Sequence, residues 1–221
     1  MTSRIPQKLA GSAAATSRPA SPAQAWAALR AGNDRFVAGT PERPNQNAAR
    51  RGEIVGGQAP FAVFFGCGDS RVAAEVIFDQ GLGDLFVVRT AGHILSDGVL
   101  GSLEFAVEEL SVPLIVVLGH DSCGAVKAAI RHYNDASMPK GYIRDIVERV
   151  TPSVIAAHRA GATTTDEVEV EHVRQTLHLI YERSQLIRNT VDRGQCAIIG
   201  LTYALAEGHA TVVDYLGVIT E

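Results

Sequence analysis

Two short polar motifs in this chain combine the residue types that bind zinc. The first, Cys67-Gly-Asp-Ser-Arg71, contains a thiol, a carboxylate and a guanidinium, and the second, His120-Asp-Ser-Cys123, contains an imidazole and a thiol. Zinc in proteins takes cysteine sulfur, histidine nitrogen and carboxylate oxygen, and three protein ligands with one exchangeable position are typical of a catalytic zinc. We therefore predict Cys67, His120 and Cys123 as zinc ligands, with Asp69 as a conditional fourth ligand.

Each motif follows a continuous apolar run that predicts a strand covered on both faces, over residues 61–66 and 114–119. Ligands bind at the carboxyl ends of the strands in open parallel sheets, so both motifs are predicted at the binding edge. Residues 123–130 have a helical pattern, and Asp121 or Ser122 is expected to cap this helix. A cysteine at a helix start feels the positive end of the backbone dipole, which favours the thiolate that a metal binds.

The other periodic segments predict a single α/β domain with a mostly parallel sheet flanked by helices. A strand, taken as buried, and two late strands are predicted at residues 84–90, 196–203 and 211–216. The turn at Glu207-Gly208 joins the late strands most simply as an antiparallel hairpin at the sheet edge. Amphipathic helices, the last two taken as long surface helices, are predicted at residues 23–37, 99–110, 141–160 and 169–191.

The helix predicted at residues 23–37 forms an N-terminal arm. Its apolar face contains Trp26, Leu29 and Phe36. Such a helix either lies across a partner subunit or packs on its own sheet, and the pattern does not separate the two. Residues 1–22 before it are rich in alanine, serine, threonine and proline, carry three positive charges and lack the apolar core of a secretory signal. They are predicted to be a disordered tail, which leaves residues 23–221 as the folded domain.

Composition excludes several classes of protein. With 221 residues and 46% hydrophobic content, the chain is long enough to bury the core of one domain, and no apolar stretch is long enough to cross a membrane. A net charge of −4 with dispersed lysine and arginine makes nucleic acid an unexpected partner. Three cysteines without an export signal favour a reducing compartment, and the cytoplasm is expected. Cys196 lies among apolar residues and is predicted to be a buried structural thiol.

Other cysteine chemistries can be compared with the same spacing. A tyrosine-phosphatase loop needs an arginine six places after the cysteine, where this chain has Ala73. A dinucleotide-binding loop needs a third glycine where this chain has Arg71. A cysteine nucleophile with a histidine base stays open, as Cys67 with His120 or as Cys123 with His93, because sequence does not show which side chains meet. A purely structural zinc also stays open.

The two motifs together resemble those of the β-class carbonic anhydrases. The resemblance extends over nearly all of residues 23–221, and its most specific parts are residues 85–92, 101–107 and 117–124. It implies a zinc enzyme, with one zinc ion per subunit, that interconverts carbon dioxide and bicarbonate. It also implies a homodimer or homotetramer with sites at the subunit interface. The three ligands of the family pattern coincide with Cys67, His120 and Cys123.

The resemblance also implies roles for the residues around the metal. Asp69 either binds zinc in place of water or pairs with Arg71, and in the pair it orients the zinc-bound hydroxide that attacks carbon dioxide. Gln58 from the neighbouring subunit hydrogen-bonds bicarbonate, and Gly92 brings its backbone close to the metal-bound species. A small apolar pocket for carbon dioxide is lined by Phe86, Ala91 and Phe105.

Some finer properties stay open at this level. A second, inhibitory bicarbonate site in some β-class enzymes uses a tryptophan where this chain has Phe64, although its arginine is matched by Arg89. Relatives of the family hydrolyse carbon disulfide or carbonyl sulfide, and the ligand pattern does not discriminate among these linear molecules. A non-catalytic zinc protein is a third hypothesis, against which the Asp69 and Arg71 pair stands. No histidine is identified as a proton shuttle.

Overall fold

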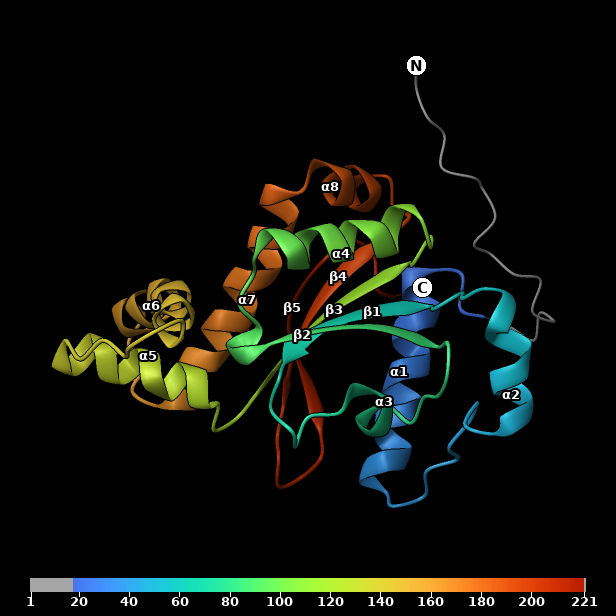
Figure 1. Ribbon diagram of the computed structural model, residues 1–221, viewed down its shortest axis with the longest axis horizontal. Helices are drawn as coiled ribbons and strands as arrows, with labels where there is room; N and C mark the ends of the chain where they lie inside the picture. Colours follow the sequence, from blue (N-terminus) through green and yellow to red (C-terminus); the bar gives the residue numbers. More distant parts are fainter. Residues whose placement is uncertain (1–17, 221) are drawn as a thin grey trace.

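A computed structural model of the chain describes residues 18–220. The predicted tail at residues 1–22 therefore lies mostly outside the described residues. The strands of the described part form one sheet in the order β2-β1-β3-β4-β5 (Figure 1). They are β1 (Ala62–Cys67), β2 (Leu85–Thr90), β3 (Leu114–His120), β4 (Ala197–Tyr203) and β5 (Ala210–Leu216). The first four pair in parallel and β5 pairs antiparallel to β4, which confirms the predicted mostly parallel α/β fold with an antiparallel edge strand.

Helices cover both faces of this sheet. They are α1 (Pro22–Val37), α2 (Ala48–Glu53), α3 (Ala74–Ile77), α4 (Asp97–Glu108), α5 (Gly124–Asp135), α6 (Ile143–Arg159), α7 (Thr165–Arg183) and α8 (Gln185–Asp192). Two short 3₁₀ segments, Ile54–Gly56 and Ala91–His93, complete the order. Figure 1 shows α4 and α8 above the sheet and α1 and α3 below it. Within the described residues, no helix is both long and apolar enough to cross a membrane.

Side chains that alternate along the strands build a hydrophobic core on each face. Phe64 belongs to the core below the sheet, and Phe65 belongs to the core above it. Trp26 and Leu29 of α1 are buried in the lower core, so this helix packs on its own sheet, which is one of its two predicted placements. Burying a side chain the size of Leu29 contributes about 1.5–3 kcal/mol, which anchors α1 to the strands.

Two predictions were wrong, one about the burial of a strand and one about the length of a helix. Strand 84–90 was expected to be buried, but β2 is an edge strand of the sheet and most of its residues are only partly buried. The helix predicted at 169–191 is divided at Ser184, whose backbone is extended and whose hydroxyl accepts the N–H of Ile187 to cap α8. The first of the two pieces, α7, is amphipathic as predicted: Leu177 and Ile180 are fully buried against the sheet, whereas Leu179 and Glu182 are exposed.

The carboxyl ends of the parallel strands point towards α5 and α6, which project to the left of the sheet in Figure 1. A third hydrophobic cluster joins these helices to the strand ends. It contains Cys67, Cys123, Val126, Val147 and Val150. Both predicted metal-binding cysteines therefore lie where the sheet meets the α5 and α6 pair.

Candidate metal centre

Three predicted ligands converge at the carboxyl edge of the sheet. Cys67 is the last residue of β1, His120 is the last residue of the neighbouring strand β3, and Cys123 immediately precedes α5. One side-chain donor atom from each lies within 4.8 Å of the others, and all three residues are buried. The grouping of two thiols with one imidazole matches the donor preferences of zinc.

The hydrogen bonding of His120 fits a metal ligand. Its Nδ1 atom lies 2.8 Å from the carbonyl oxygen of Asp121, which only accepts hydrogen bonds, so Nδ1 carries the proton. The Nε2 atom is then unprotonated, and it is buried without a hydrogen-bond partner. A buried nitrogen lone pair that faces two sulfur atoms and has no donor is the arrangement expected of an imidazole that binds a metal ion.

The two thiols are electrostatically linked. A hydrogen bond from the Cys123 thiol is the largest effect that lowers the pKa of Cys67, and the same bond raises the pKa of Cys123. The backbone N–H of Gly92 also donates to Cys67 Sγ, with a nitrogen–sulfur distance of 3.4 Å. Cys67 is therefore held as a thiolate, the form of cysteine that binds metals.

Asp69 and Arg71 form a bidentate pair at the rim of the centre. Arg71 Nε donates to Asp69 Oδ1 at 2.9 Å and Arg71 Nη2 donates to Asp69 Oδ2 at 2.7 Å. These bonds hold the pKa of Asp69 well below its usual range. Asp69 Oδ2 lies 3.9 Å from His120 Nε2, so the carboxylate borders the ligand group without joining it. Of the two fates predicted for Asp69, this structure contains the pair with Arg71.

Arg89 supports the loop that carries these groups. Its Nε atom donates to the carbonyl oxygen of Cys67 at 2.8 Å, and its Nη2 atom donates to the carbonyl oxygen of Asp69 at 2.5 Å. Phe64, the position considered for an inhibitory bicarbonate site, is 1% exposed and packs on Phe78 with ring centroids 4.9 Å apart. In this structure, Arg89 therefore holds the metal loop and Phe64 packs in the core.

The capping prediction for the helix after the second motif was wrong. The N-cap residue of α5 is Cys123, and no side chain caps this helix. Asp121 instead accepts the backbone N–H of Leu205, and Ser122 has a left-handed backbone with φ of 55°. The helix therefore begins one or two residues later than either predicted cap, and the residue at its start is the predicted ligand Cys123.

The residues predicted around the substrate divide into two groups. Ala91 and Gly92 directly follow β2 and lie beside the metal ligands, with Gly92 buried. Gln58, by contrast, is exposed and precedes the amino end of β1, whereas Cys67 is at its carboxyl end. Phe86 pairs with Val63 in the sheet, about 13 Å along β2 from the residue that pairs with Cys67.

Phe105 lies with the distant group. Its ring centroid is 6.2 Å from that of Phe86, and its side chain is largely exposed for a phenylalanine, at 39%. Within one protomer, Gln58, Phe86 and Phe105 therefore stand at the opposite end of the strands from the metal ligands. One protomer does not assemble the predicted pocket by itself.

Two buried polar residues behind the metal ligands were not identified from sequence. Glu169 Oε1 accepts the backbone N–H of His120 at 3.1 Å, and burial raises the pKa of Glu169 to about 8. His172 contacts the carbonyl oxygen of Gly92 at 2.9 Å. Both residues stand on the buried face of α7 next to Val168 and Val173. The available signal was a glutamate and a histidine at helical spacing within an apolar stripe.

The structure gives little support to either cysteine–histidine pair as nucleophile and base. His93 is fully buried, and neither of its ring nitrogens has a hydrogen-bond partner in the described part of the chain, so it makes no hydrogen bond to Cys123 there. His120 does meet Cys67, but Cys123 joins the same group. A nucleophile and base pair leaves this second thiol without a role.

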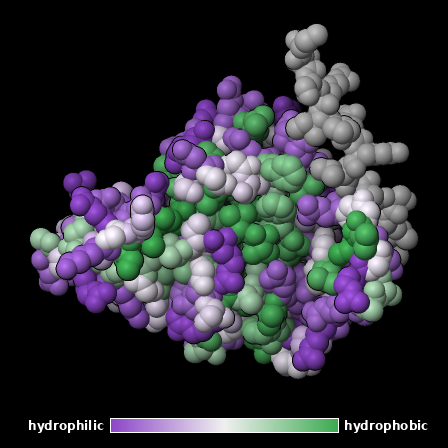
Figure 2. Space-filling model, in the orientation of Figure 1, coloured by the Kyte–Doolittle hydropathy of each residue, from purple (hydrophilic) through white to green (hydrophobic). Residues whose placement is uncertain are grey.

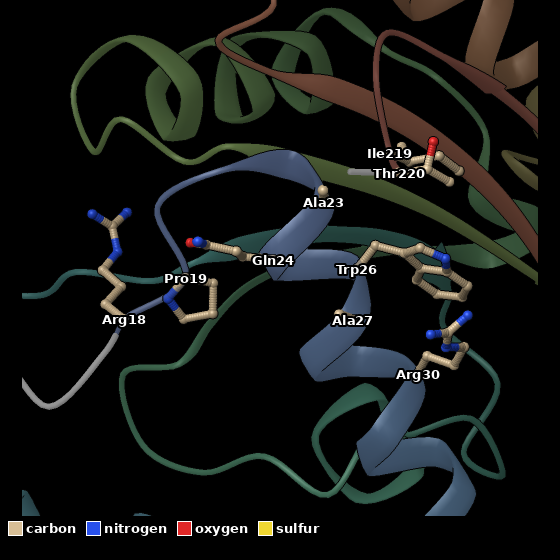
Figure 3. A pocket seen from close by; sticks show the side chains of 9 residues that line it. All are labelled: Arg18, Pro19, Ala23, Gln24, Trp26, Ala27, Arg30, Ile219 and Thr220. Atoms are coloured by element: carbon tan, nitrogen blue, oxygen red, sulfur yellow. The ribbon is translucent and has the colours of Figure 1, made fainter.

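A wide cavity lies elsewhere on the molecule. It has a volume of about 800 Å³ and is open to solvent beside α1, where Trp26 and Arg30 face Ile219 and Thr220 (Figure 3). None of the predicted site residues lines this cavity. Cavity size therefore does not locate the metal centre, which is identified by its donor atoms.

Comparison with known proteins identifies the family of the chain. The family model described as carbonic anhydrase matches residues 62–210, which include both motifs. Carbonic anhydrase 2 of Mycobacterium tuberculosis is 55% identical over 200 residues, which are 90% of this chain and 97% of that protein. The carbonic anhydrase of Mycolicibacterium smegmatis is 54% identical over 200 residues, again 90% of this chain and 97% of that protein.

Solved structures have the same fold. A Coccomyxa β-carbonic anhydrase in complex with acetazolamide is 25% identical, with a TM-score of 0.65 over 73% of this chain and 75% of that chain. CafA of Aspergillus fumigatus is 23% identical, with a TM-score of 0.64 over 86% of this chain and 90% of that chain, and shows likeness of fold. The chain belongs to the β-class carbonic anhydrases. It is an enzyme of the lyase class, and carbon dioxide hydration is the general reaction of its family.

Proposed function

We propose that this protein hydrates carbon dioxide reversibly with one zinc ion per subunit, bound by Cys67, His120 and Cys123. The buried Nε2 atom of His120 beside two thiols carries this proposal, because this nitrogen has no hydrogen-bond partner among the described residues. When bound there, zinc lowers the pKa of a coordinated water towards neutrality and so supplies a hydroxide nucleophile. The Asp69 and Arg71 pair distinguishes this centre from a closed structural site.

Asp69 and Arg71 are proposed to orient the attacking water. The bidentate contact fixes the plane of the carboxylate, and its Oδ2 atom lies on the side of His120 Nε2. An ionised carboxylate only accepts hydrogen bonds. Asp69 is therefore proposed to accept the hydrogen of the attacking water, so that the oxygen lone pair of this water points away from Asp69. If Asp69 left Arg71, its carboxylate would be available as the conditional fourth ligand of a bound zinc and would take the place of the reacting water. Asp69 is thus proposed to gate the centre as well.

Activity is expected to increase with pH. Two thiolates offset the formal charge of the metal, which makes its bound water less acidic than three neutral histidines do. The experiment is stopped-flow carbon dioxide hydration on zinc-quantified protein from mildly acidic to mildly alkaline pH. A steep rise supports the proposed gate, and strong activity that is independent of pH contradicts it. No hydration by zinc-loaded protein contradicts the proposed reaction and favours carbonyl sulfide, carbon disulfide or a non-catalytic role.

A matched pair of variants tests the role of Asp69. Asp69→Asn is expected to lower kcat about 100-fold, as misplacement of a reacting group does. Asp145→Asn is the control, because Asp145 also pairs with an arginine, accepting from Arg149 Nε on α6, outside the metal-ligand group. The control is expected to retain full activity. Equal activities of the two variants contradict the proposed role of Asp69.

A second subunit is proposed to complete the substrate pocket. Three predicted pocket residues lie far from the metal ligands of their own protomer, namely Gln58, Phe86 and Phe105. They can therefore act only at the metal centre of a second subunit. Figure 2 shows hydrophobic residues gathered in the middle of the face where β2 runs in Figure 1. β2 is also a sheet edge without a pairing strand on its outer side among residues 18–220, and proteins usually cover such edges. A homodimer, or a homotetramer as in the solved structures described as tetrameric from Sordaria macrospora, is therefore proposed.

Light scattering tests this assembly. The intact protein is expected to be a dimer or tetramer, and Phe105→Asp is expected to yield smaller particles with little activity. A fully active monomer contradicts the shared pocket. A cytoplasmic location is also proposed, because the centre needs reduced thiols and all three cysteines are free.

A further inference from the structure

His172 occupies a polar position inside the packed face of α7. It is 4% exposed, and both ring nitrogens have partners. The Nε2 atom lies 2.9 Å from the carbonyl oxygen of Gly92, so Nε2 donates. The Nδ1 atom lies 2.9 Å from Ser153 Oγ, which also lies 3.0 Å from Gln175 Oε1, so in a neutral imidazole Nδ1 and Gln175 Oε1 are the two acceptors for the one hydroxyl hydrogen. The ring is thus fixed in one tautomer and one orientation by contacts on two separate segments.

The contact with Gly92 connects α7 to the metal centre. The N–H of Gly92 donates to Cys67 Sγ, while its carbonyl oxygen accepts from His172. These two groups lie on either side of one Cα atom. Gly92 has φ of 65° and ψ of 25°, a left-handed conformation in the residue type with the fewest backbone restrictions. An anchor on its carbonyl therefore limits the rotation that would move the N–H away from sulfur.

The N–H···S bond has a direct chemical effect. Hydrogen bonds to a ligand sulfur lower its basicity and orient its lone pairs, so outer partners adjust the charge that reaches the metal. A packing role alone is served better by an apolar residue, because burial of imidazole is unfavourable without hydrogen bonds.

We propose that His172 is a positioning residue for the metal centre, which holds Gly92 so that its N–H bonds the Cys67 thiolate. This inference rests on the proposed binding of metal by Cys67. A series of contacts joins Ser153 to His172, His172 to Gly92, and Gly92 to the sulfur of Cys67, and these four residues belong to four separate segments.

The experiment uses two amides that differ in reach. In His172→Gln the side-chain nitrogen extends to the place of Nε2, whereas in His172→Asn it extends only to the place of Nδ1. Cobalt(II)-substituted holoprotein is the probe, and its thiolate-to-cobalt absorption band reports on the ligand sulfur. Zinc affinity is measured by competition with a chromophoric chelator. Ile180→Val is the packing control, because Ile180 stands on the same helix, α7, and is fully buried in the apolar core.

The Asn variant is expected to move the absorption band to longer wavelength and to weaken zinc binding about 10- to 100-fold. The Gln variant is expected to restore both properties, and Ile180→Val is expected to keep both while it lowers the unfolding temperature. An Asn variant with the wild-type band and affinity overturns the role of His172. A band shift in Ile180→Val as large as that in His172→Asn also overturns it, because the effect is then general loosening of α7.

Failure of the proposed function gives a different result. Wild-type protein without any thiolate-to-cobalt band overturns the metal centre and, with it, this inference. A wild-type band without carbon dioxide hydration overturns the reaction, while the comparison of the two amides still tests His172. If His172→Asn does not fold, Ser153→Ala removes the donor that orients the ring. This variant must then shift the band in the same direction, and an unchanged band overturns the proposal.

Discussion

Gly92→Ala tests whether the short path between β2 and α5 holds the metal centre together. A Cβ atom added at Gly92 lies 2.5 Å from the Cβ atom of Ala125, two residues after the ligand Cys123. The same methyl group is placed on a backbone with φ of 65°. The substitution therefore combines a steric overlap with backbone strain, and both act where Gly92 donates to Cys67. We expect lower stability together with weaker metal retention.

The size of the loss follows from these two terms. A non-glycine residue in the left-handed region costs about 1–2 kcal/mol. The overlap is far inside the ordinary carbon–carbon contact of about 3.5–4 Å, and overpacking of this kind costs about 1–3 kcal/mol. Replacement of glycine also stiffens the unfolded chain, which returns about 0.5–1 kcal/mol. The free energy of unfolding is therefore expected to decrease by about 2–4 kcal/mol.

Urea unfolding at fixed protein concentration measures this change, and two further variants separate its causes. Ala125→Gly removes the opposing methyl group at a helix-propensity cost of about 1 kcal/mol. In the double variant it relieves the overlap but not the backbone strain, so a double-mutant cycle is expected to show about 1–3 kcal/mol of favourable coupling. Gly101→Ala is the control, because nothing lies within 4 Å of its added Cβ, and a gain of about 0.5–1 kcal/mol is expected.

Two results refute this reasoning. A Gly92→Ala protein within about 0.5 kcal/mol of wild-type stability shows that neither strain nor overlap is present. A loss of the expected size with zero coupling to Ala125→Gly shows that the overlap is absent and that only the backbone term acts. Zinc content of each purified variant completes the test, and full retention in a destabilised Gly92→Ala protein separates folding from metal binding.

Further predictions concern pH, thiol reactivity and the metal loop. Although burial raises the pKa of Asp79, its contact with Arg35 at 2.6 Å and two backbone N–H groups lowers it overall. The stabilisation by ionised Asp79 is therefore fully present above the carboxyl pKa of the unfolded chain and is lost as pH falls through the lower pKa of the folded protein. Urea unfolding midpoints of the wild type are expected to decrease over this acid range, and those of Asp79→Asn are expected to decrease less. Burial raises the pKa of Cys196 to about 12, so alkylation of metal-stripped protein, read by peptide mass spectrometry, is expected at Cys67 and not at Cys196. Arg89→Gln removes both bonds to the carbonyls of the metal loop and is expected to lower kcat about 10-fold in a folded protein, and unchanged kcat contradicts this.

Several features of the fold were predictable from local sequence. The continuous apolar runs before Cys67 and His120 predicted parallel strands, because only strands covered on both faces lack polar residues on alternate positions. The hairpin at Glu207-Gly208 was predictable from its turn residues. The break at Ser184 was missed because the apolar spacing continues on both sides of it, and a single extended residue leaves little mark on that pattern.

The residue types and their places along the chain determined by themselves which groups were available for chemistry. Cys67, His120 and Cys123 could be identified because strand ends and a helix start are local features, and thiol and imidazole have few other uses in such positions. The tertiary structure alone decided which distant side chains meet them. His172 is separated from Gly92 by 80 residues, and no local pattern encodes a contact of that kind.

The edge position of β2 and the distance of Gln58 from its own metal ligands also depend on the order of strands. That order minimises the free energy of the whole packed core, to which residues from every part of the described chain contribute.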